Sequence, residues 1–132
     1  MGVTGETMTK KIEAIVREEK LVDVKDALHE IGIVGVNVFE VRGHGRQGGI
    51  RLVGRSGSYA VDMLPKMQVN IVLSDHNVAK TVETIRRAAF TGEEGDGMIF
   101  VLPVAEVIRI RTGERDGEAL HYQDDIDARR RP

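Results

Sequence analysis

Residues 91–114 read TGEEGDGMIFVLPVAEVIRIRTGE and combine an acidic glycine loop, a short apolar strand and two arginines. Glycine has no Cβ, so the backbone of the Gly-Asp-Gly motif at residues 95–97 can approach a ligand closely. Arg109 and Arg111 are two residues apart, so on an extended strand they share one face. Open backbone amides and paired guanidinium groups suit a polyphosphate. The stretch therefore indicates phosphate or nucleotide binding, and a tight turn beside a solvated edge strand is the simpler alternative.

Length and composition describe one small domain with an aliphatic core. The chain has 132 residues, of which 41% are apolar, 30% charged and only 4% aromatic. A formal net charge of −2 gives no bulk attraction to nucleic acid, so we expect no nucleic-acid partner. The lack of cysteine excludes disulfides and thiolate metal sites. No apolar run reaches membrane-spanning length and the first residues form no apolar signal region, so we expect a cytoplasmic protein without direct membrane insertion.

Hydrophobic periodicity predicts two β-α-β units separated by a long loop. The first unit comprises a strand at residues 11–16, a helix at residues 21–31 and a strand at residues 34–41. Residues 43–58 contain six glycines and hold neither a helical nor a strand period for long, which predicts a loop.

The second unit begins with an extended segment at residues 59–73, which Pro65 interrupts. A proline inside a strand favours an edge strand or a bent one. Ser74 is placed to cap a second helix, and Gly92 follows that helix as a stop signal. Residues 98–102 are predicted as the fourth strand, followed by a short turn and the strand that carries the arginines.

This order of elements predicts an α+β fold of the ferredoxin-like split βαβ type. Two helices can cover only one face of a four-stranded sheet, so the other face stays open. A half-apolar open face on a small domain indicates a partner. The residues expected on that face are Glu13, Ile15, Asn37, Phe39, Asn70 and Val72.

Three sequence blocks occur together in this chain. Besides residues 91–114, they are VFEVRGHGRQ at residues 38–47 and YAVDMLPK at residues 59–66. In their order and spacing these blocks resemble the PII nitrogen-regulatory signal proteins, and the resemblance runs over residues 10–117. It implies a PII-like domain that forms a homotrimer, with the sheets of three copies packed around a three-fold axis.

Two segments lie outside this resemblance. Residues 1–9 are expected to be a disordered N-terminal extension and residues 118–132 a disordered C-terminal tail. The tail carries three aspartates followed by Arg129, Arg130 and Arg131. Opposite charges in a polar segment with few apolar residues are typical of a solvated, self-neutralising extension.

The resemblance also implies a nucleotide site in the cleft between subunits. In the PII family the matching residues hold ATP or ADP, with the two arginines on the phosphates and the glycine loop beside them. Taken one at a time, several of these residues are equally typical of an apolar core or an ordinary turn. The nucleotide contacts that the resemblance predicts are Ile15, Gly35, Asn37, Gly45, Arg46, Gln47, Val72, Gly95, Asp96, Gly97, Met98, Arg109 and Arg111.

A second group of residues matches the root of the family's T-loop. The resemblance implies that Gln47 is a ligand of the magnesium ion that accompanies ATP. It further implies that Gln47, Gly49 and Lys66 contact the effector 2-oxoglutarate. A flexible surface loop and an ordinary surface lysine are the alternative interpretations.

The remainder of the T-loop is the part least like the family. Arg55 matches an arginine that plugs an ammonium channel in family members, and Tyr59 matches a tyrosine that is uridylylated in some of them. The neighbours Gly57 and Ser58 differ from the family pattern, which favours a strand residue at Tyr59 over a modification site. The targets implied are an ammonium transporter, glutamine synthetase or modifying enzymes.

Met98 stands where the family usually has a lysine that reaches the phosphates. A thioether cannot supply that positive charge, and losing one phosphate-directed cation costs about 1–3 kcal/mol. The preference among ATP, ADP and AMP therefore stays open. A carbon-side relative that senses ADP or AMP together with bicarbonate is an alternative within the same architecture.

An enzyme with a ferredoxin-like fold, such as a phosphatase, is an alternative from another class. No activated nucleophile and no histidine-centred cluster stands out in the sequence. We therefore predict a non-enzymatic sensor of adenine nucleotides and 2-oxoglutarate, whose T-loop is ordered or released by ligands and so binds or leaves a target.

Overall fold

The computed structural model describes residues 8–43, 50–54, 57–61, 64–120 and 125–127. Within them the chain forms two α-helices, two short 3-10 helices (η1 and η2) and six strands. In chain order they are β1 (Thr9–Arg17), η1 (Glu18–Lys20), α1 (Leu21–Glu30), β2 (Asn37–Gly43), β3 (Ile50–Gly54), β4 (Gly57–Val61), β5 (Leu64–Ser74), η2 (Asp75–Asn77), α2 (Val78–Ala89) and β6 (Gly97–Val104).

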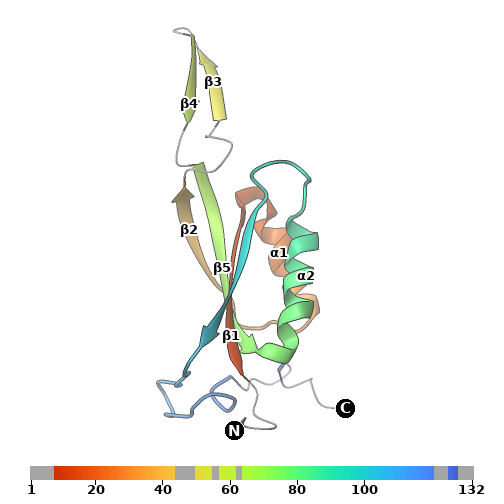
Figure 1. Ribbon diagram of the computed structural model, residues 1–132, viewed down its shortest axis with the longest axis vertical. Coiled ribbons are helices and arrows are strands. Elements are labelled where there is room, and N and C mark those ends of the chain that lie inside the picture. The colour runs from red at the N-terminus through yellow and green to blue at the C-terminus, as the bar shows by residue number, and fades with distance from the viewer. Residues whose placement is uncertain (1–7, 44–49, 55–56, 62–63, 121–124, 128–132) are drawn as a thin grey trace.

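The main sheet has four antiparallel strands in the order β2-β5-β1-β6. Both α-helices lie side by side on one face of this sheet, and β3 and β4 form a separate hairpin that extends beyond the end of β2 and β5 (Figure 1). The predicted α+β, ferredoxin-like split βαβ fold is confirmed.

The apolar core lies between the sheet and the two helices. Because successive side chains of a strand point to opposite faces, Ile12, Ala14 and Val16 of β1 all face the helices and are buried. From α1, Val24 and Leu28 meet them at one-turn spacing. Each fully buried aliphatic side chain contributes about 1.5–3 kcal/mol. The other buried members of the core are Ile33, Val69, Ile71, Leu73, Ile85, Ala89 and Ile126.

The opposite face of the sheet is not covered by any described element of this chain. Phe39, Val72 and Phe100 are exposed there, as the alternation of the strands requires. Asn70 lies in the middle of the same face and is only 5% exposed. Its Oδ1 accepts a hydrogen bond from Gln68 Nε2 at 2.9 Å, while its Nδ2 has no partner among the described residues. An exposed apolar surface around a polar group of this kind suits contact with another molecule.

The prediction of a loop over residues 43–58 is wrong for the part that the structure describes. β3 and β4 pair in antiparallel register, with Leu52 opposite Tyr59. These strands have five residues each, and β3 ends and β4 begins with a glycine, so their alternation is too brief to form a recognisable period in the sequence. Pro65 likewise does not mark an edge strand, because it lies at the start of β5, a central strand.

The prediction that Ser74 caps the second helix with its side chain is also wrong. Ser74 is extended and precedes η2, and its side chain makes no capping hydrogen bond. α2 begins only at Val78, after one turn of 3-10 helix, and its buried positions Thr81, Ile85 and Ala89 recur at helical spacing.

The predicted arginine strand is a tight turn instead. After β6 the chain forms one isolated antiparallel bridge between Ile108 and Arg115. The N–H of Arg109 donates to the Glu114 carbonyl at 2.8 Å, and the N–H of Gly113 donates to the Arg109 carbonyl at 2.7 Å. Gly113 has a φ of +75°, which permits this return of the chain. Arg109 and Arg111 therefore do not share one face of an extended strand.

Parts of the two predicted extensions are packed on the domain. β1 begins at Thr9, inside the expected N-terminal extension, and residues 1–7 lie outside the described residues. In the tail, Ile126 belongs to the apolar core, and Asp125 and Asp127 are each 8% exposed. The expectation of disorder thus fails for residues 125–127, because an apolar side chain fills a gap in the core and both carboxylates find N–H donors.

Candidate functional site

The glycine loop between α2 and β6 is organised by the carboxylate of Asp96. Oδ2 accepts the main-chain N–H groups of Thr91 and Gly92, each at 2.9 Å. Oδ1 accepts the Thr91 hydroxyl and, at 3.0 Å, Nε of Arg17. These hydrogen bonds hold the pKa of Asp96 well below its ordinary value, and the bonds from the Thr91 hydroxyl and N–H have the largest effect. Asp96 is therefore ionised at neutral pH, and both its oxygens are engaged inside the loop.

Two cationic side chains of the sheet, Arg17 and Lys66, donate hydrogen bonds to main-chain carbonyls of the same loop. Nη2 of Arg17, at the end of β1, donates to the Glu94 carbonyl at 2.7 Å. Nζ of Lys66, near the start of β5, donates to the carbonyl of Gly95. Burial and the nearby charge of Arg17 lower the pKa of Lys66. No local motif of the sequence indicates Arg17, because Arg17 and Asp96 are 79 positions apart.

Gly97 is required by the sheet itself. It opens β6 opposite Val16 with a φ of +107°. A Cβ at this position would lie 1.7 Å from the main-chain oxygen of Ile15, which no side chain can tolerate. The close approach that glycine allows here is therefore between two strands of the protein, and it fixes the loop against β1.

Two clefts flank the glycine loop. One, of about 350 Å³, lies between α2 and the ends of β1 and β6 and is mainly apolar. It brings together four of the predicted nucleotide contacts, Ile15, Asp96, Gly97 and Met98. Met98 is paired with Ile15 across the strands and is 61% exposed. The other cleft, of about 310 Å³, is charged, and its lining residues are Arg17, Glu18, Glu19, Leu64, Pro65, Lys66 and Glu94.

A second group of predicted contacts lies away from the loop. Asn37 is exposed at the start of β2, opposite the buried Asn70, and Gly35 is exposed two residues before it. Val72 is exposed on the same open face, where it pairs with Lys11 of β1. The sequence identified Asn70 only as a polar residue of this face. The placement of the neighbouring strands reveals that its buried Nδ2 has no partner in the part of the chain that the structure describes.

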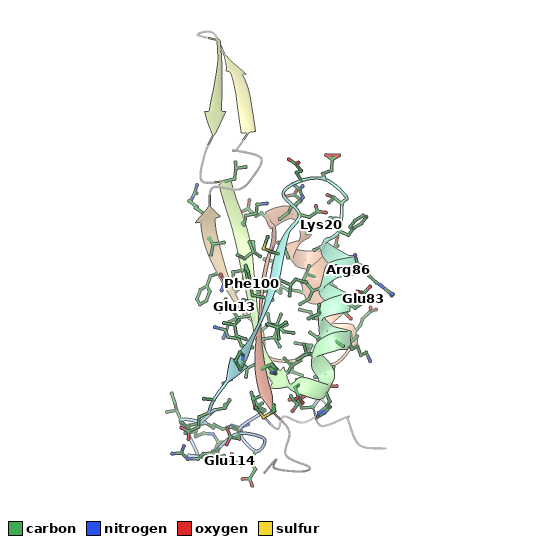
Figure 2. The ribbon with its side chains drawn as sticks, viewed as in Figure 1. Glu13, Lys20, Glu83, Arg86, Phe100 and Glu114 are labelled. Atoms are coloured by element: carbon green, nitrogen blue, oxygen red, sulfur yellow. The ribbon has the colours of Figure 1, made fainter. Side chains whose placement is uncertain are left out.

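The two arginines lie at the opposite end of β6 from the glycine loop. β6 has eight residues, so at about 3.3 Å per residue it spans on the order of 25 Å. Nη2 of Arg109 donates to the Ala119 carbonyl at 2.8 Å, and Nη1 lies 3.6 Å from the carboxylate of Glu114. Arg111 is exposed on the turn. Figure 2 shows Glu114 at the far end of the molecule from the glycine loop. One chain therefore does not bring its own arginines to its own loop.

Several predicted site residues lie outside the described residues. They are Gly45, Arg46, Gln47, Gly49 and Arg55. For Tyr59 the backbone is described as part of β4.

The described part of the chain offers no ready-made metal centre. Within it, no three His, Cys, Asp or Glu side chains are grouped so that they could hold a metal ion. Among the same residues, no helix combines the length and the apolar character needed to cross a membrane.

Fold and site together define a small split βαβ protein with an open sheet face and ligand-sized clefts beside a preformed glycine loop. The sequence model of the family described as "Nitrogen regulatory protein P-II" matches residues 9–114. The chain belongs to this family, whose members are regulatory signal proteins and not enzymes.

Individual relatives agree with this assignment. The chain is 52% identical to the nitrogen regulatory protein P-II of Azospirillum brasilense over 111 residues, which are 84% of this chain and 99% of the relative. It is 53% identical to the nitrogen regulatory protein P-II 1 of Escherichia coli over the same coverage. A crystal structure of Arabidopsis thaliana PII bound to citrate matches with a TM-score of 0.66 at 38% identity, over 89% of this chain and 96% of that one.

Proposed function

We propose that this protein is a homotrimeric sensor that binds ATP or ADP between the glycine loop of one copy and the arginine turn of the next. The observation that carries the proposal is the separation of the two halves along β6. A polyphosphate needs both the amide-rich loop and the guanidinium groups, and a single chain presents them at opposite ends. A cyclic assembly joins the loop half of each copy to the arginine half of its neighbour.

The open sheet face supports a trimer as the assembly. Three copies packed through these faces would cover Phe39, Val72 and Phe100, which the single chain leaves exposed. The same contact would place Asn37 and its neighbour Asn70 at a subunit boundary, where a bound nucleotide can satisfy Nδ2 of Asn70, which lacks a partner among the described residues.

The charged cleft beside the loop suits an anionic effector, for which we propose 2-oxoglutarate. Arg17 and Lys66 supply two cations there, and Gln47 and Gly49 complete the site in the proposal. A carboxylate in this cleft would take Lys66 from the Gly95 carbonyl and so couple the effector to the nucleotide loop. A relative that is 38% identical was crystallised with citrate, which, like 2-oxoglutarate, carries more than one carboxylate group.

Magnesium would arrive with ATP. Since the described residues contain no acidic cluster for it, the ATP phosphates would supply most ligands and Gln47 one more. The segment between β2 and β5, which contains Arg55 and Tyr59, would then be the output. Ligands would order or release it, and it would bind or leave an ammonium transporter or an enzyme of nitrogen metabolism.

The first test is the mass in solution. Sedimentation or light scattering should give three times the 14.6 kDa of the chain. A monomer at micromolar concentration would exclude a site built from two copies.

A mixing experiment tests the shared site directly. The double variant Arg109→Ala, Arg111→Ala removes the arginine half, and Met98→Glu places an anion in the loop half at an exposed position. Neither variant should bind ADP when it is the only chain in the trimer. Trimers refolded from an equal mixture should regain binding at about a quarter of the interfaces, where an intact loop meets intact arginines. No recovery in the mixture would place both halves in one chain.

Titration distinguishes the effectors. Calorimetry with ATP, ADP and AMP, each with and without 2-oxoglutarate and magnesium, should show 2-oxoglutarate binding only beside a nucleotide. Lys66→Ala should lose the effector and retain ADP. If bicarbonate binds with ADP or AMP and 2-oxoglutarate does not, the carbon-side alternative that Met98 favours is correct.

A further inference from the structure

The end of the chain carries a feature outside the family match, which ends at residue 114. Asp125, Ile126 and Asp127, here called the C-terminal clasp, are docked on the domain between the end of α1 and the start of α2. Ile126 fills a place in the apolar core and is 5% exposed. Its N–H donates to the Gly32 carbonyl at 2.7 Å. A buried apolar anchor with a main-chain hydrogen bond makes this a specific contact.

The two carboxylates of the clasp accept N–H groups on either side of that anchor. Oδ1 of Asp125 accepts the main-chain N–H of Val34 at 3.1 Å, and its Oδ2 accepts the N–H of Asp127 at 3.2 Å. Oδ1 of Asp127 accepts Nδ2 of Asn77 at 2.7 Å, and Oδ2 accepts the N–H of Ser74 at 3.2 Å. Asp127 thus lies at the start of η2 and α2, where the first N–H groups of a helix have no partner within the helix.

The contact with Val34 lies directly before the half-site of the proposed nucleotide pocket. Residues 33–36 belong to no helix or strand, and β2 begins at Asn37. Among the described residues, the Asp125–Val34 hydrogen bond is the last one that holds this connection before the strand starts. Gly35, which has no side chain to pack, lies between Val34 and Asn37. Asn37 is held by its pairing with Asn70 of β5, so Gly35 is the contact residue whose position depends on how firmly Val34 is held.

We propose that the C-terminal clasp positions Gly35, directly before the strand that carries Asn37, for the nucleotide by fixing the connection between α1 and β2. This proposal rests on the nucleotide function proposed above. When the clasp is released, residues 33–36 sample more conformations, and only a fraction of them is competent to bind. The apparent dissociation constant rises by the inverse of that fraction. Asp125 and Asp127 are thus positioning residues that act through the backbone of the domain.

The experiment compares full-length variants at Asp125 and Ile126 with a control on α1. Asp125→Ala removes the acceptor for Val34, whereas Asp125→Asn keeps one side-chain oxygen in the same place. Ile126→Asp removes the apolar anchor and should release the whole clasp. Asp26→Ala, on an exposed position of α1, is the matched control. Hydrogen exchange at the Val34 and Ser74 amides reports docking, and ADP titration reports the nucleotide site.

We expect the amide of Val34 to exchange at least about ten-fold faster in Asp125→Ala and Ile126→Asp, because opening then requires no broken hydrogen bond to Asp125. The dissociation constant for ADP should rise about three- to ten-fold in both. Asp125→Asn should restore most of both values, and Asp26→Ala should change neither. Rescue by asparagine would show that the side-chain oxygen that accepts the Val34 N–H, and not the charge of Asp125, is required.

Three results would contradict parts of this account in different ways. Unchanged exchange at Val34 in Asp125→Ala and Ile126→Asp would overturn the clasp. Faster exchange with unchanged ADP affinity would overturn its positioning role. If the wild-type trimer does not bind ADP, the proposed nucleotide function fails and the positioning role falls with it, while the exchange data alone decide whether the clasp exists.

Discussion

The glycine loop and the arginine turn lie at the two ends of β6, and the protein builds them in different ways. The loop is held from three sides: by Asp96 within it, by Arg17 and Lys66 from the sheet, and by the contact of Gly97 with Ile15. Every carbonyl or carboxylate that these cations reach belongs to the loop. The single chain therefore holds the glycine loop in place entirely through its own contacts.

The arginine turn is also held by hydrogen bonds within its own chain, but it leaves an apolar side chain uncovered. The N–H of Arg109 donates to the Glu114 carbonyl and its Nη2 donates to the Ala119 carbonyl, while Ile110, between the arginines, is 100% exposed. A fully exposed isoleucine beside an exposed Arg111 gains nothing from its own chain. The loop is therefore preformed by intramolecular contacts, whereas the turn leaves Ile110 and Arg111 exposed to solvent. This asymmetry is consistent with the shared site proposed above.

The largest expected effect breaks the preformed half. Gly97→Ala places a methyl group 1.7 Å from the Ile15 oxygen and forces a side chain to a φ of +107°. We expect a loss of at least about 3 kcal/mol in unfolding free energy, or no folded protein, because two backbones must separate. Urea unfolding followed by circular dichroism measures this loss.

Gly113→Ala in the arginine turn is the matched control. Gly113 also has a positive φ, of +75°, but a Cβ there would meet nothing within 4 Å. The substitution should cost only about 1 kcal/mol, the conformational penalty alone. Equal losses at both glycines would mean that the loop is no more tightly built than the turn.

Substitutions in the arginine turn should instead change the affinity for ADP. We expect Arg109→Ala and Arg111→Ala each to weaken ADP binding by roughly 1–3 kcal/mol, since each removes charge-assisted hydrogen bonds. Stability should fall only in Arg109→Ala, whose side chain also contacts Ala119 and Glu114. Calorimetric titration beside thermal unfolding checks both, with the exposed Arg87→Ala on α2 as the control. Unchanged ADP affinity in both variants would leave the turn without a role in the site.

A smaller effect concerns pH and the loop carboxylate. The pKa of Asp96 is lowered in the folded state, so its contribution to stability is present above the ordinary pKa of about 4 and is lost as the pH falls below it. Asp96→Asn should therefore lower stability at pH 7 and flatten the decline in stability between neutral and acidic pH.

Glu83 also has a lowered pKa, so its contribution to the loss of stability at acidic pH must be distinguished from that of Asp96. Hydrogen bonds from Arg86, then Arg87, lower its pKa to about 2 on the exposed side of α2 (Figure 2). Glu83→Gln, studied in parallel, reports the acid response that does not involve the loop. If Asp96→Asn and the wild type lose the same stability on acidification, the carboxylate does not hold the loop as the geometry indicates.

Strong periodicity made most of the fold predictable from the sequence. The strands and helices around the core were found because their apolar residues alternate or recur at helical spacing over many positions. The arginine turn shows where such patterns mislead. Ile108, Arg109, Ile110 and Arg111 alternate as a strand does, but a strand also needs a neighbour, and among the described residues only Ile108 has a bridge partner. Gly113 then reverses the chain.

The site was predictable where one motif contains it and not where the sheet assembles it. Asp96 and Gly97 were identified from the motif at residues 95–97. Arg17 came to the loop only through the register that pairs Val16 with Gly97. The C-terminal clasp could not be predicted from the sequence, because the composition of residues 118–132 describes only the average character of the tail. Docking depends on a single apolar residue, Ile126, between two acceptors. Tertiary contacts of this kind leave no local pattern.

The smallest expected effect sharpens the comparison at the loop itself. Met98 is one of the residues that line the apolar cleft and is 61% exposed, so Met98→Lys can be accommodated without burying its charge. The new ammonium group would face the phosphate tail of the nucleotide, and its benefit should grow with phosphate charge. Lysine loses side-chain entropy when it is held, so the net gain for ATP should be only about 1 kcal/mol.

Calorimetry with ATP and AMP at two salt concentrations checks this prediction, with Met98→Leu as the uncharged control. The gain for ATP should shrink as salt rises, because the cleft is open to solvent and its charges are screened. AMP, with a single phosphate, should gain less than ATP, and Met98→Leu should gain for neither. An equal gain for AMP would mean that residue 98 does not face the phosphates. The loop half would then bind a different part of the ligand, and the arginine turn of the neighbouring copy would have to neutralise the phosphate charge alone.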